Sequence, residues 1–152
     1  MRNVILFFLF FSFPVFCNSL SFNDFPSENA SGDFVDKLIV DGDDYSSIYL
    51  DDAKIALIDG QVNFNGHYVV FVSSCGGGCI YGGIVDKVSG VLIGFPDAFF
   101  SGDDDSFELK YKVNSGLICF NGTSSETGES GQKCYVVHGG KMEKVPGLLH
   151  EK

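Results

Sequence analysis

Hydrophobic and polar residues alternate most regularly from Phe107 to Val113, where Phe, Leu, Tyr and Val alternate with Glu and Lys. Because successive side chains of a strand point to opposite faces, this alternation predicts a strand with one buried face. Other runs are rich in β-branched and aromatic residues, which favour strands. They span residues 34–40, 66–74, 80–88, 91–95, 117–120, 134–137 and 141–145. Tight turns such as Ser89-Gly90 and Gly139-Gly140 connect several of these runs, so we predict an antiparallel meander.

The segment from Ser46 to Gly60 has the features of a helix. Ser46 or Ser47 can cap its first turn, and Gly60 can end it after Asp59. One face would be lined by Ile48, Ala53, Ala56 and Leu57, whereas Ile55 and Ile58 depart from this period. A single N-terminal helix would cover one face of the meander, so the expected fold class is α+β.

The expected domain organisation is a single unit. Residues 34–147 are predicted to form one α+β domain, since they contain no internal repeat and no further apolar span. The polar residues 20–33 predict a flexible lead-in, residues 96–106 a surface loop, and residues 148–152 a frayed tail.

Residues 1–19 have the pattern of a secretory signal peptide. Arg2 precedes an apolar run from Val4 to Phe16, and small residues before position 20 predict cleavage after Ser19. The apolar run is shorter than the roughly 20 residues that a membrane span needs. A signal anchor is one alternative, and lipoprotein cleavage at Cys17 is another that the bulky Phe16 disfavours. We therefore expect a periplasmic or secreted protein without a membrane segment after cleavage.

The charge balance favours some partners over others. The chain has 10 basic and 20 acidic residues, a net charge of −10, and loss of Arg2 would make it −11. Nucleic acids and anionic membrane surfaces are polyanions, so neither is an expected partner. A cationic protein partner fits this charge, although acidity also serves the solubility of exported proteins. No motif indicates a cofactor.

The cysteines predict two disulfides. Removal of Cys17 with the signal peptide would leave an even set. Cys75 and Cys79 are separated only by three glycines and can close a small ring. Cys119 and Cys134 flank a polar, glycine-rich stretch, so a hairpin centred on that stretch places them opposite one another. We predict the pairs 75–79 and 119–134. A zinc site is the alternative, which the spacing and the lack of nearby histidines disfavour.

Three motifs follow one another closely along the chain. They are Asn63-Phe64-Asn65-Gly66-His67-Tyr68, Cys75-Gly76-Gly77-Gly78-Cys79 and Gly83-Ile84-Val85-Asp86-Lys87-Val88-Ser89-Gly90. Together they resemble a group of small exported bacterial proteins with Asn-Phe-x-Gly-His-Tyr, Cys-Gly-x-Gly-Cys and Val-Asp-x-x-x-Gly motifs. The resemblance extends over roughly residues 45–145. It implies an exported protein and no particular activity.

The expected layout is also similar to that of the inhibitor of vertebrate lysozyme family. In that family a short disulfide-closed loop between two central strands enters the lysozyme active site, and this loop carries a histidine and an aspartate. The ring of this chain holds only Gly76, Gly77 and Gly78, so it offers no side-chain carboxylate. The likeness therefore implies a shared layout and a projecting ring.

The ring from Cys75 to Cys79 is the first candidate site. Its glycines permit positive φ and can present backbone N–H groups as an anion-binding nest. The same glycines are also what a small bridged turn needs to close without clashes. A redox role is a third interpretation, which the absence of a Cys-x-x-Cys motif disfavours.

His67 is the second candidate, as a general base or a pH-sensitive group. Its catalytic partners would be Asp86 and Ser74, but no Gly-x-Ser-x-Gly motif supports a hydrolase. A histidine that bonds to a turn or to a buried carboxylate is the commoner outcome.

Two further features have weaker claims. Acidic clusters at residues 41–44 and 103–105 could bind calcium, but neither matches an EF-hand loop, and no metal site is predicted. Phe95, Phe99 and Phe100 either anchor a partner or pack beneath the adjacent loop.

The leading hypothesis is an exported, non-enzymatic binding protein. It would be an inhibitor or immunity-type blocker of a cationic enzyme that acts on the cell envelope, such as a lysozyme. Its candidate binding residues are Cys75, Gly76, Gly77, Gly78, Cys79 and His67. The alternatives are a small secreted hydrolase that uses His67 and Asp86, and an accessory envelope protein without a soluble ligand.

Overall fold

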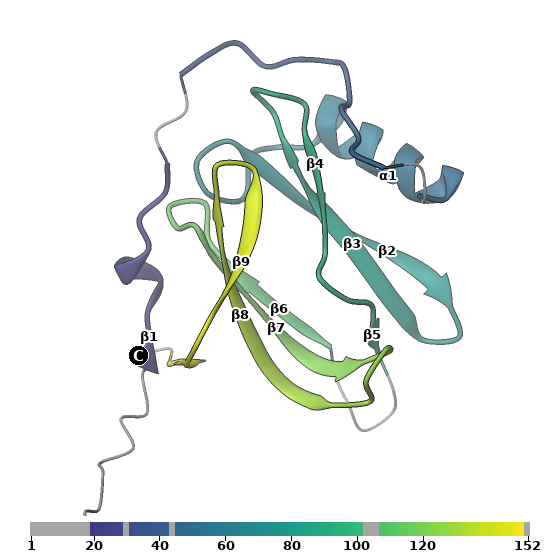
Figure 1. The fold of residues 1–152 in the computed structure, drawn as a ribbon. Helices are drawn as coiled ribbons and strands as arrows, with labels where there is room; N and C mark the ends of the chain where they lie inside the picture. The colour runs from purple at the N-terminus through teal and green to yellow at the C-terminus, as the bar shows by residue number, and fades with distance from the viewer. Residues whose placement is uncertain (1–18, 29–30, 43–44, 102–106, 151–152) are drawn as a thin grey trace, which may run out of the picture.

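A computed structural model describes residues 19–28, 31–42, 45–101 and 107–150 of the chain. One helix packs on a curled antiparallel sheet, and two disulfides join Cys75 to Cys79 and Cys119 to Cys134 (Figure 1). The α+β fold and both predicted pairings are therefore confirmed. Within these ranges no helix is long and apolar enough to cross a membrane. Residues 1–18 of the predicted signal peptide (1–19), Asp43 and Asp44 of one acidic cluster, and the whole cluster at 103–105 lie outside the described residues.

Helix α1 runs from Ser47 to Asp59, as its capping residues predict. The Ser46 side chain accepts a hydrogen bond from the Tyr49 N–H, and Gly60 follows the last turn. The buried face consists of Tyr49, Ala53, Ala56 and Leu57. The prediction for Ile48 was wrong: its side chain is 67% exposed, and the neighbouring Tyr49 packs on the sheet instead. The reason is that the Tyr49 hydroxyl reaches across the sheet to donate to the Gly82 carbonyl at 3.1 Å.

The main sheet is antiparallel and follows the chain closely. Its strands lie in the order β2 (Tyr68–Gly76), β3 (Cys79–Asp86), β5 (Phe99–Phe100), β7 (Leu117–Ser124), β8 (Ser130–His138) and β9 (Lys141–Val145). Strand β4 (Leu92–Gly94) pairs with β3, and β6 (Glu108–Tyr111) pairs with β7. Figure 1 shows α1 over the β2–β3 part of the sheet, while the β6–β9 part curls toward the other side of β2–β3.

Two predictions about individual strands were wrong. Residues 34–40 form no strand: they run along the turn between β3 and β4, where the Ile39 N–H donates to the Gly90 carbonyl at 2.7 Å. Phe34 and Ile39 stay 61% and 49% exposed, whereas Val35, Leu38 and Val40 are partly buried against the core beneath α1. The predicted loop 96–106 instead contains β5, since the Phe99 ring is buried and stacks on Phe120 at 5.3 Å.

The hydrophobic core lies on both faces of the β2–β3 hairpin. Between the two parts of the curled sheet, the buried residues are Phe64, Tyr68, Val70, Ile84, Phe99, Ile118, Phe120 and Val137. Beneath α1 they are Tyr49, Ala53, Ala56, Leu57, Val69, Val85 and Leu92. Neighbouring residues of β2 thus point to opposite cores, as the two-residue period of a strand requires.

The N-terminal residues are tied to the sheet rather than loosely ordered. Strand β1 (Ser19–Leu20) pairs in parallel with β10 (Leu148–Leu149), and a short 3-10 helix, η1 (Phe22–Asp24), follows. Leu20 and Phe22 are buried against Leu117 and the Cys119–Cys134 disulfide. The flexible lead-in and the frayed tail were predicted from polarity alone, which misses these two apolar anchors and the pairing of the two ends.

Candidate functional site

The Cys75–Cys79 ring forms the tip of the β2–β3 hairpin. Residues 74–78 are exposed, and the φ angles of Gly76, Gly77 and Gly78 are 84°, 58° and 80°. Three successive residues in the left-handed region need glycine, so closure of the ring alone accounts for its three glycines. The Gly78 carbonyl accepts a hydrogen bond from the Ser101 N–H at 2.7 Å, which fixes one side of the ring. The ring stands clear of the sheet on its other side (Figure 1).

The ring supplies little chemistry of its own. The Gly76 N–H donates to the Ser74 hydroxyl at 3.3 Å, and this hydroxyl donates to the Cys79 carbonyl at 3.4 Å. Part of the predicted anion-binding nest is therefore used by internal bonds. Any partner that touches the ring meets backbone and sulfur, and specificity must come from the side chains beside it.

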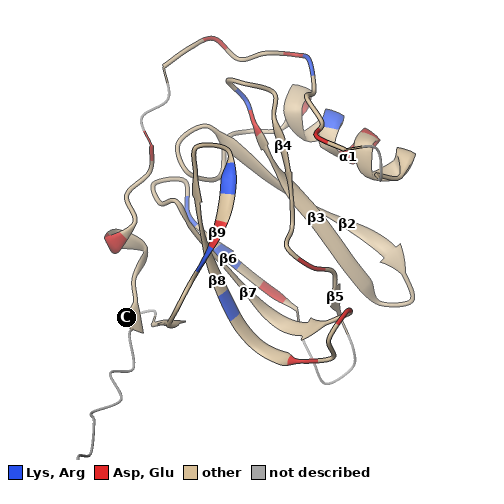
Figure 2. Cartoon of the chain, viewed as in Figure 1, with Lys and Arg blue, Asp and Glu red and all other residues tan. Residues whose placement is uncertain are grey.

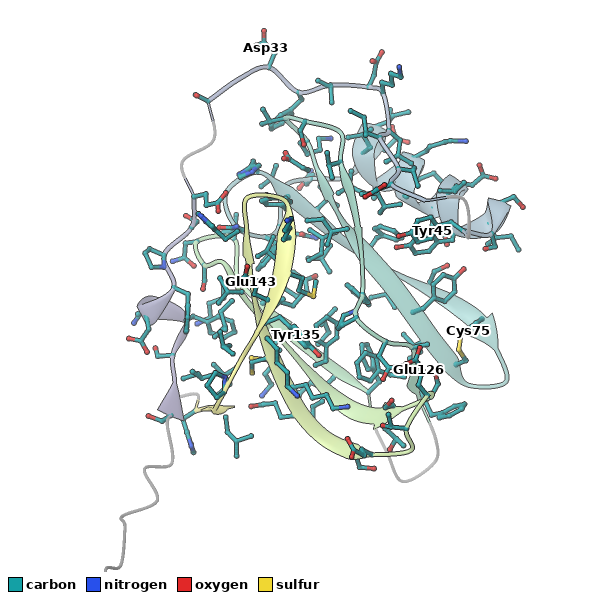
Figure 3. All side chains as sticks on the ribbon, in the orientation of Figure 1. Asp33, Tyr45, Cys75, Glu126, Tyr135 and Glu143 are labelled. Carbon is teal, nitrogen blue, oxygen red and sulfur yellow. A yellow bond between two sulfur atoms is a disulfide. The ribbon has the colours of Figure 1, made fainter. Side chains whose placement is uncertain are left out.

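Those side chains surround a groove of about 840 Å³ next to the ring. Its walls come from the start of α1, the ring, β3, the segment between β4 and β5, and the turn between β7 and β8. The side chains that define its character are Tyr45, Tyr81, Phe95, Asp97 and Glu126. Figure 3 shows Tyr45, Cys75 and Glu126 around this side of the molecule, with Glu143 well away from it.

Three tyrosines form a stack along one wall of the groove. The Tyr45 and Tyr49 rings lie 5.1 Å apart with an interplanar angle of 17°, and Tyr49 and Tyr81 lie 5.1 Å apart at 29°. Tyr49 is buried in the middle, and burial raises the pKa of its hydroxyl, as do the nearby Tyr45 and Tyr81. The outer rings, Tyr45 and Tyr81, are half-buried and line the groove.

Glycine makes room for the stack. A Cβ added at Gly83 would lie 2.6 Å from the Tyr49 hydroxyl, and one at Gly82 would lie 2.7 Å from the Phe95 ring. The paired glycines of β3 are therefore needed for close approach of aromatic rings on both faces of the strand. The sequence signals this only as two glycines inside a strand pattern.

The groove is acidic. Its lining includes the carboxylates of Asp97 and Glu126 and, among the described residues, no lysine or arginine. Asp97 accepts a hydrogen bond from the Ser124 hydroxyl through Oδ2, while its Oδ1 is buried without a hydrogen-bond partner among the described residues. Figure 2 shows acidic positions between β4 and β5 and at the turn between β7 and β8, beside the groove.

His67 and Asp86 lie together, but at the opposite end of the β2–β3 hairpin from the ring. Their Nε2 and Oδ1 atoms are 3.7 Å apart, and both side chains are almost buried. Asp86 is occupied by its own turn: it accepts from the Val88 N–H at 2.8 Å and from the Ser89 hydroxyl at 2.6 Å. Neither His67 nor Asp86 lines the groove.

Ser74 does not join this pair. It lies seven residues from His67 along the extended chain, which at ~3.3 Å per residue corresponds to ~23 Å. The structure thus brings two of the three proposed catalytic residues together in a buried corner and leaves the third beside the ring. His67 lies against the Tyr68 ring at 4.1 Å between centroids, and its Nδ1 is buried without a hydrogen-bond partner among the described residues.

Lys87 is a buried cation that the sequence did not single out. Its ammonium donates to the carbonyls of Leu57, Ile58 and Gly60 at 2.5, 3.4 and 3.0 Å. It therefore satisfies carbonyls at the end of α1, where the helix dipole favours positive charge. The only sequence signal was its place directly after a strand, next to the Asp86 turn.

Comparisons with protein-family models, with curated proteins and with solved structures find no match for this chain. Among the described residues, no three His, Cys, Asp or Glu side chains are grouped as ligands for a metal ion. The groove beside the ring is therefore the candidate site, and its function must be argued from its own chemistry.

Proposed function

We propose that this protein is an exported, non-enzymatic binding protein that takes a basic protein partner at the groove beside the Cys75–Cys79 ring. The observation that carries the proposal is the lining of that groove: aromatic rings and two carboxylates, which no basic side chain of the described residues neutralises. Such a surface attracts lysine and arginine side chains through charge and through the faces of the tyrosine rings.

The groove is suited to a cationic side chain in two ways. The half-buried rings of Tyr45, Tyr81 and Phe95 supply flat apolar area, and Asp97 and Glu126 supply negative charge beside it. An arginine stacked on a tyrosine and bonded to a carboxylate uses both contacts at once. Aromatic groups of this kind are the usual centres of binding energy in protein interfaces.

The partner we propose is a cationic enzyme that acts on the cell envelope, such as a lysozyme, and the protein would be its inhibitor or immunity-type blocker. The exposed ring at the edge of the groove is a projection that can enter a concave active site, and it contributes shape rather than charge. The acidic groove supplies the attraction that the glycine ring lacks.

The test is lysozyme-catalysed clearing of bacterial cell walls, with and without the oxidised protein, across a panel of basic lysozymes and several salt concentrations. We expect inhibition that weakens as salt rises, because exposed charges are screened. We expect inhibition to be lost when Cys75 and Cys79 are both changed to serine. Thermal melting checks that this variant still folds, since a ring this small contributes only about 2 kcal/mol in the loop-entropy model. Absence of inhibition by the oxidised protein across the panel would reject lysozyme as the partner.

A further inference from the structure

The outer border of the sheet is left partly open at β2. Strand β2 is the first strand of the sheet, so one of its sides has no neighbouring strand. The Lys87 N–H donates to the His67 carbonyl, one residue before β2. Residues that face the partner strand alternate along an antiparallel ladder, so the odd-numbered residues of β2 turn their backbone groups toward β3. Even-numbered residues, from Tyr68 to Ser74, therefore turn theirs outward.

The segment before β2 already covers half of this outward side. Tyr68 exchanges backbone hydrogen bonds with Phe64. The Asn63 side chain then pairs with Val70 in both directions, accepting from its N–H at 2.8 Å and donating to its carbonyl at 3.2 Å. In the described part of the chain, no backbone partner lies opposite Val72 or Ser74. The open edge is thus a short one, next to the ring.

We propose that the open edge of β2, from Val72 to Ser74, binds an extended basic peptide segment as an added strand. Such a strand would pair with the outward N–H and C=O groups of both residues, as in other sheets extended by a peptide. Val72 is 51% exposed and offers an apolar side chain for the peptide to cover. This site adjoins the groove beside the ring, which Ser74 also lines, but it does not depend on the function proposed for that groove.

Other sheet edges in the described chain are built differently. Strand β9 carries Lys141, Glu143 and Lys144, and β6 carries an ion pair between Glu108 and Lys110. Charged residues on an edge strand are a common protection against unwanted pairing. Residues 71–74 of β2 carry no charge, so this edge lacks that protection.

The charge next to the edge determines which peptide fits. A shallow hollow of about 340 Å³ runs between α1 and β2, lined by Asp52, Ile55, Asp59 and Val72 among others. No lysine or arginine of the described part of the chain lines it. Side chains of an added strand that point toward α1 would meet these aspartates, so they should be basic. Pairing with a second copy would bring the same aspartates of both copies together, which disfavours a dimer through this edge.

The experiment uses the oxidised protein and a capped seven-residue peptide in which lysine alternates with valine or threonine. We expect saturating peptide to slow hydrogen exchange of the Val72 and Ser74 amides at least tenfold, measured by NMR. The Val70 amide, already bonded to Asn63, should change less than twofold and serves as the internal control. A peptide with glutamate in place of lysine, and one with a central proline, should not bind.

A variant pair tests the same edge. Val72→Pro removes an outward N–H without removing a bond to β3, whereas Val72→Thr keeps the N–H and suits a strand. Val72→Pro should weaken peptide binding at least tenfold, and Val72→Thr less than threefold. Unchanged exchange at Val72 and Ser74 with saturating peptide would overturn the proposal, as would a failure to bind. Protection of these amides in a concentration-dependent dimer, measured by sedimentation without peptide, would also overturn it in favour of a second copy.

Discussion

Single residues in the turn after β3 connect several elements of the fold. Asp86 holds the turn through its own carboxylate, and the next residue, Lys87, reaches back to the end of α1. Gly90 then closes the turn with a φ of 79°, and a Cβ there would lie 2.2 Å from the Lys37 carbonyl. One short segment therefore joins the sheet, the helix and the extended residues 34–40.

Lys87→Met should lower the free energy of unfolding by about 2–4 kcal/mol, because buried carbonyls at the end of α1 lose a charged donor. Urea unfolding measures this loss. Lys54→Met is the matched control: Lys54 is exposed and bonded only to Asp51, so we expect a change below about 0.5 kcal/mol. Equal effects of the two variants would show that Lys87 does not fasten the helix.

Gly77→Ala and Gly90→Ala separate the two reasons for glycine in this chain. Both positions have positive φ, but an added Cβ at Gly77 meets nothing within 4 Å. Gly77→Ala should therefore cost only the conformational strain, about 1–2 kcal/mol. Gly90→Ala adds a backbone clash and should cost clearly more or prevent folding. Thermal and urea unfolding compare them, and a similar loss in both would contradict this distinction.

At the scale of elements, the N-terminal residues 19–25 pack against the β7–β8 hairpin. Phe22 in η1 is buried beside the Cys119–Cys134 disulfide, and the Ser115 hydroxyl contacts the carbonyls of Phe22 and Phe25 at 2.9 and 2.8 Å. Residues 19–25 therefore cover one end of the β7–β8 hairpin. A chain truncated beyond Leu20 would lose part of this packing.

Phe22→Ala should reduce stability by about 3–5 kcal/mol, the usual cost of deleting a buried aromatic ring. Phe100→Ala is the comparison, since Phe100 is 43% exposed on β5 and should cost no more than about 1 kcal/mol. Urea midpoints give both values. A small effect of Phe22→Ala would contradict this packing and favour the predicted flexible lead-in.

Local signals predicted most elements, and long-range contacts account for the misses. Ser46 and Gly60 mark the ends of α1, and the Cys119–Cys134 pair follows from a hairpin centred between them. Strand β5 could not be found, because Phe99 is a strand residue only through its stack on Phe120. Residues 34–40 have a strand-like composition, but their pairing with the sheet is limited to an isolated bridge between Ile39 and Val91, which is too short to make a strand.

The candidate site was predicted only in part for the same reason. The ring and its disulfide follow from sequence, since five consecutive residues define them. The groove beside it combines Tyr45, Tyr81, Asp97 and Glu126, which come from four separate segments. No local pattern joins them, so only the fold reveals that acidic and aromatic side chains meet there.

At the scale of the whole molecule, the two ends of the β2–β3 hairpin differ. The end with His67 and Asp86 is closed, because both side chains are almost buried and Asp86 is bonded within its own turn. These residues belong to two of the three sequence motifs. The other end carries the exposed ring, the acidic groove and the open edge of β2. We therefore expect binding at the open end.

The closed end should make the fold sensitive to alkali. Burial raises the pKa of Tyr68 to about 12, with further contributions from the negative charges of Asp86 and Glu28. Because the unfolded pKa is about 10, stability is full below pH 10 and falls as the pH rises toward 12. Tyr68→Phe should flatten this decline, measured as the urea midpoint against pH. An equally steep decline in the variant would rule out Tyr68 as its source.

Binding at the open end is the central claim, and reversal of a single charge tests it most directly. Glu126 lines the groove and Glu143 lies on β9, away from it, and both are exposed (Figure 3). Calorimetric titration with a basic lysozyme at low salt should show binding that Glu126→Lys weakens at least tenfold. Glu143→Lys changes the net charge equally and should weaken binding less than threefold. Equal weakening by both variants would show that the lysozyme responds only to the net charge of the protein. That result would contradict a binding site in the groove.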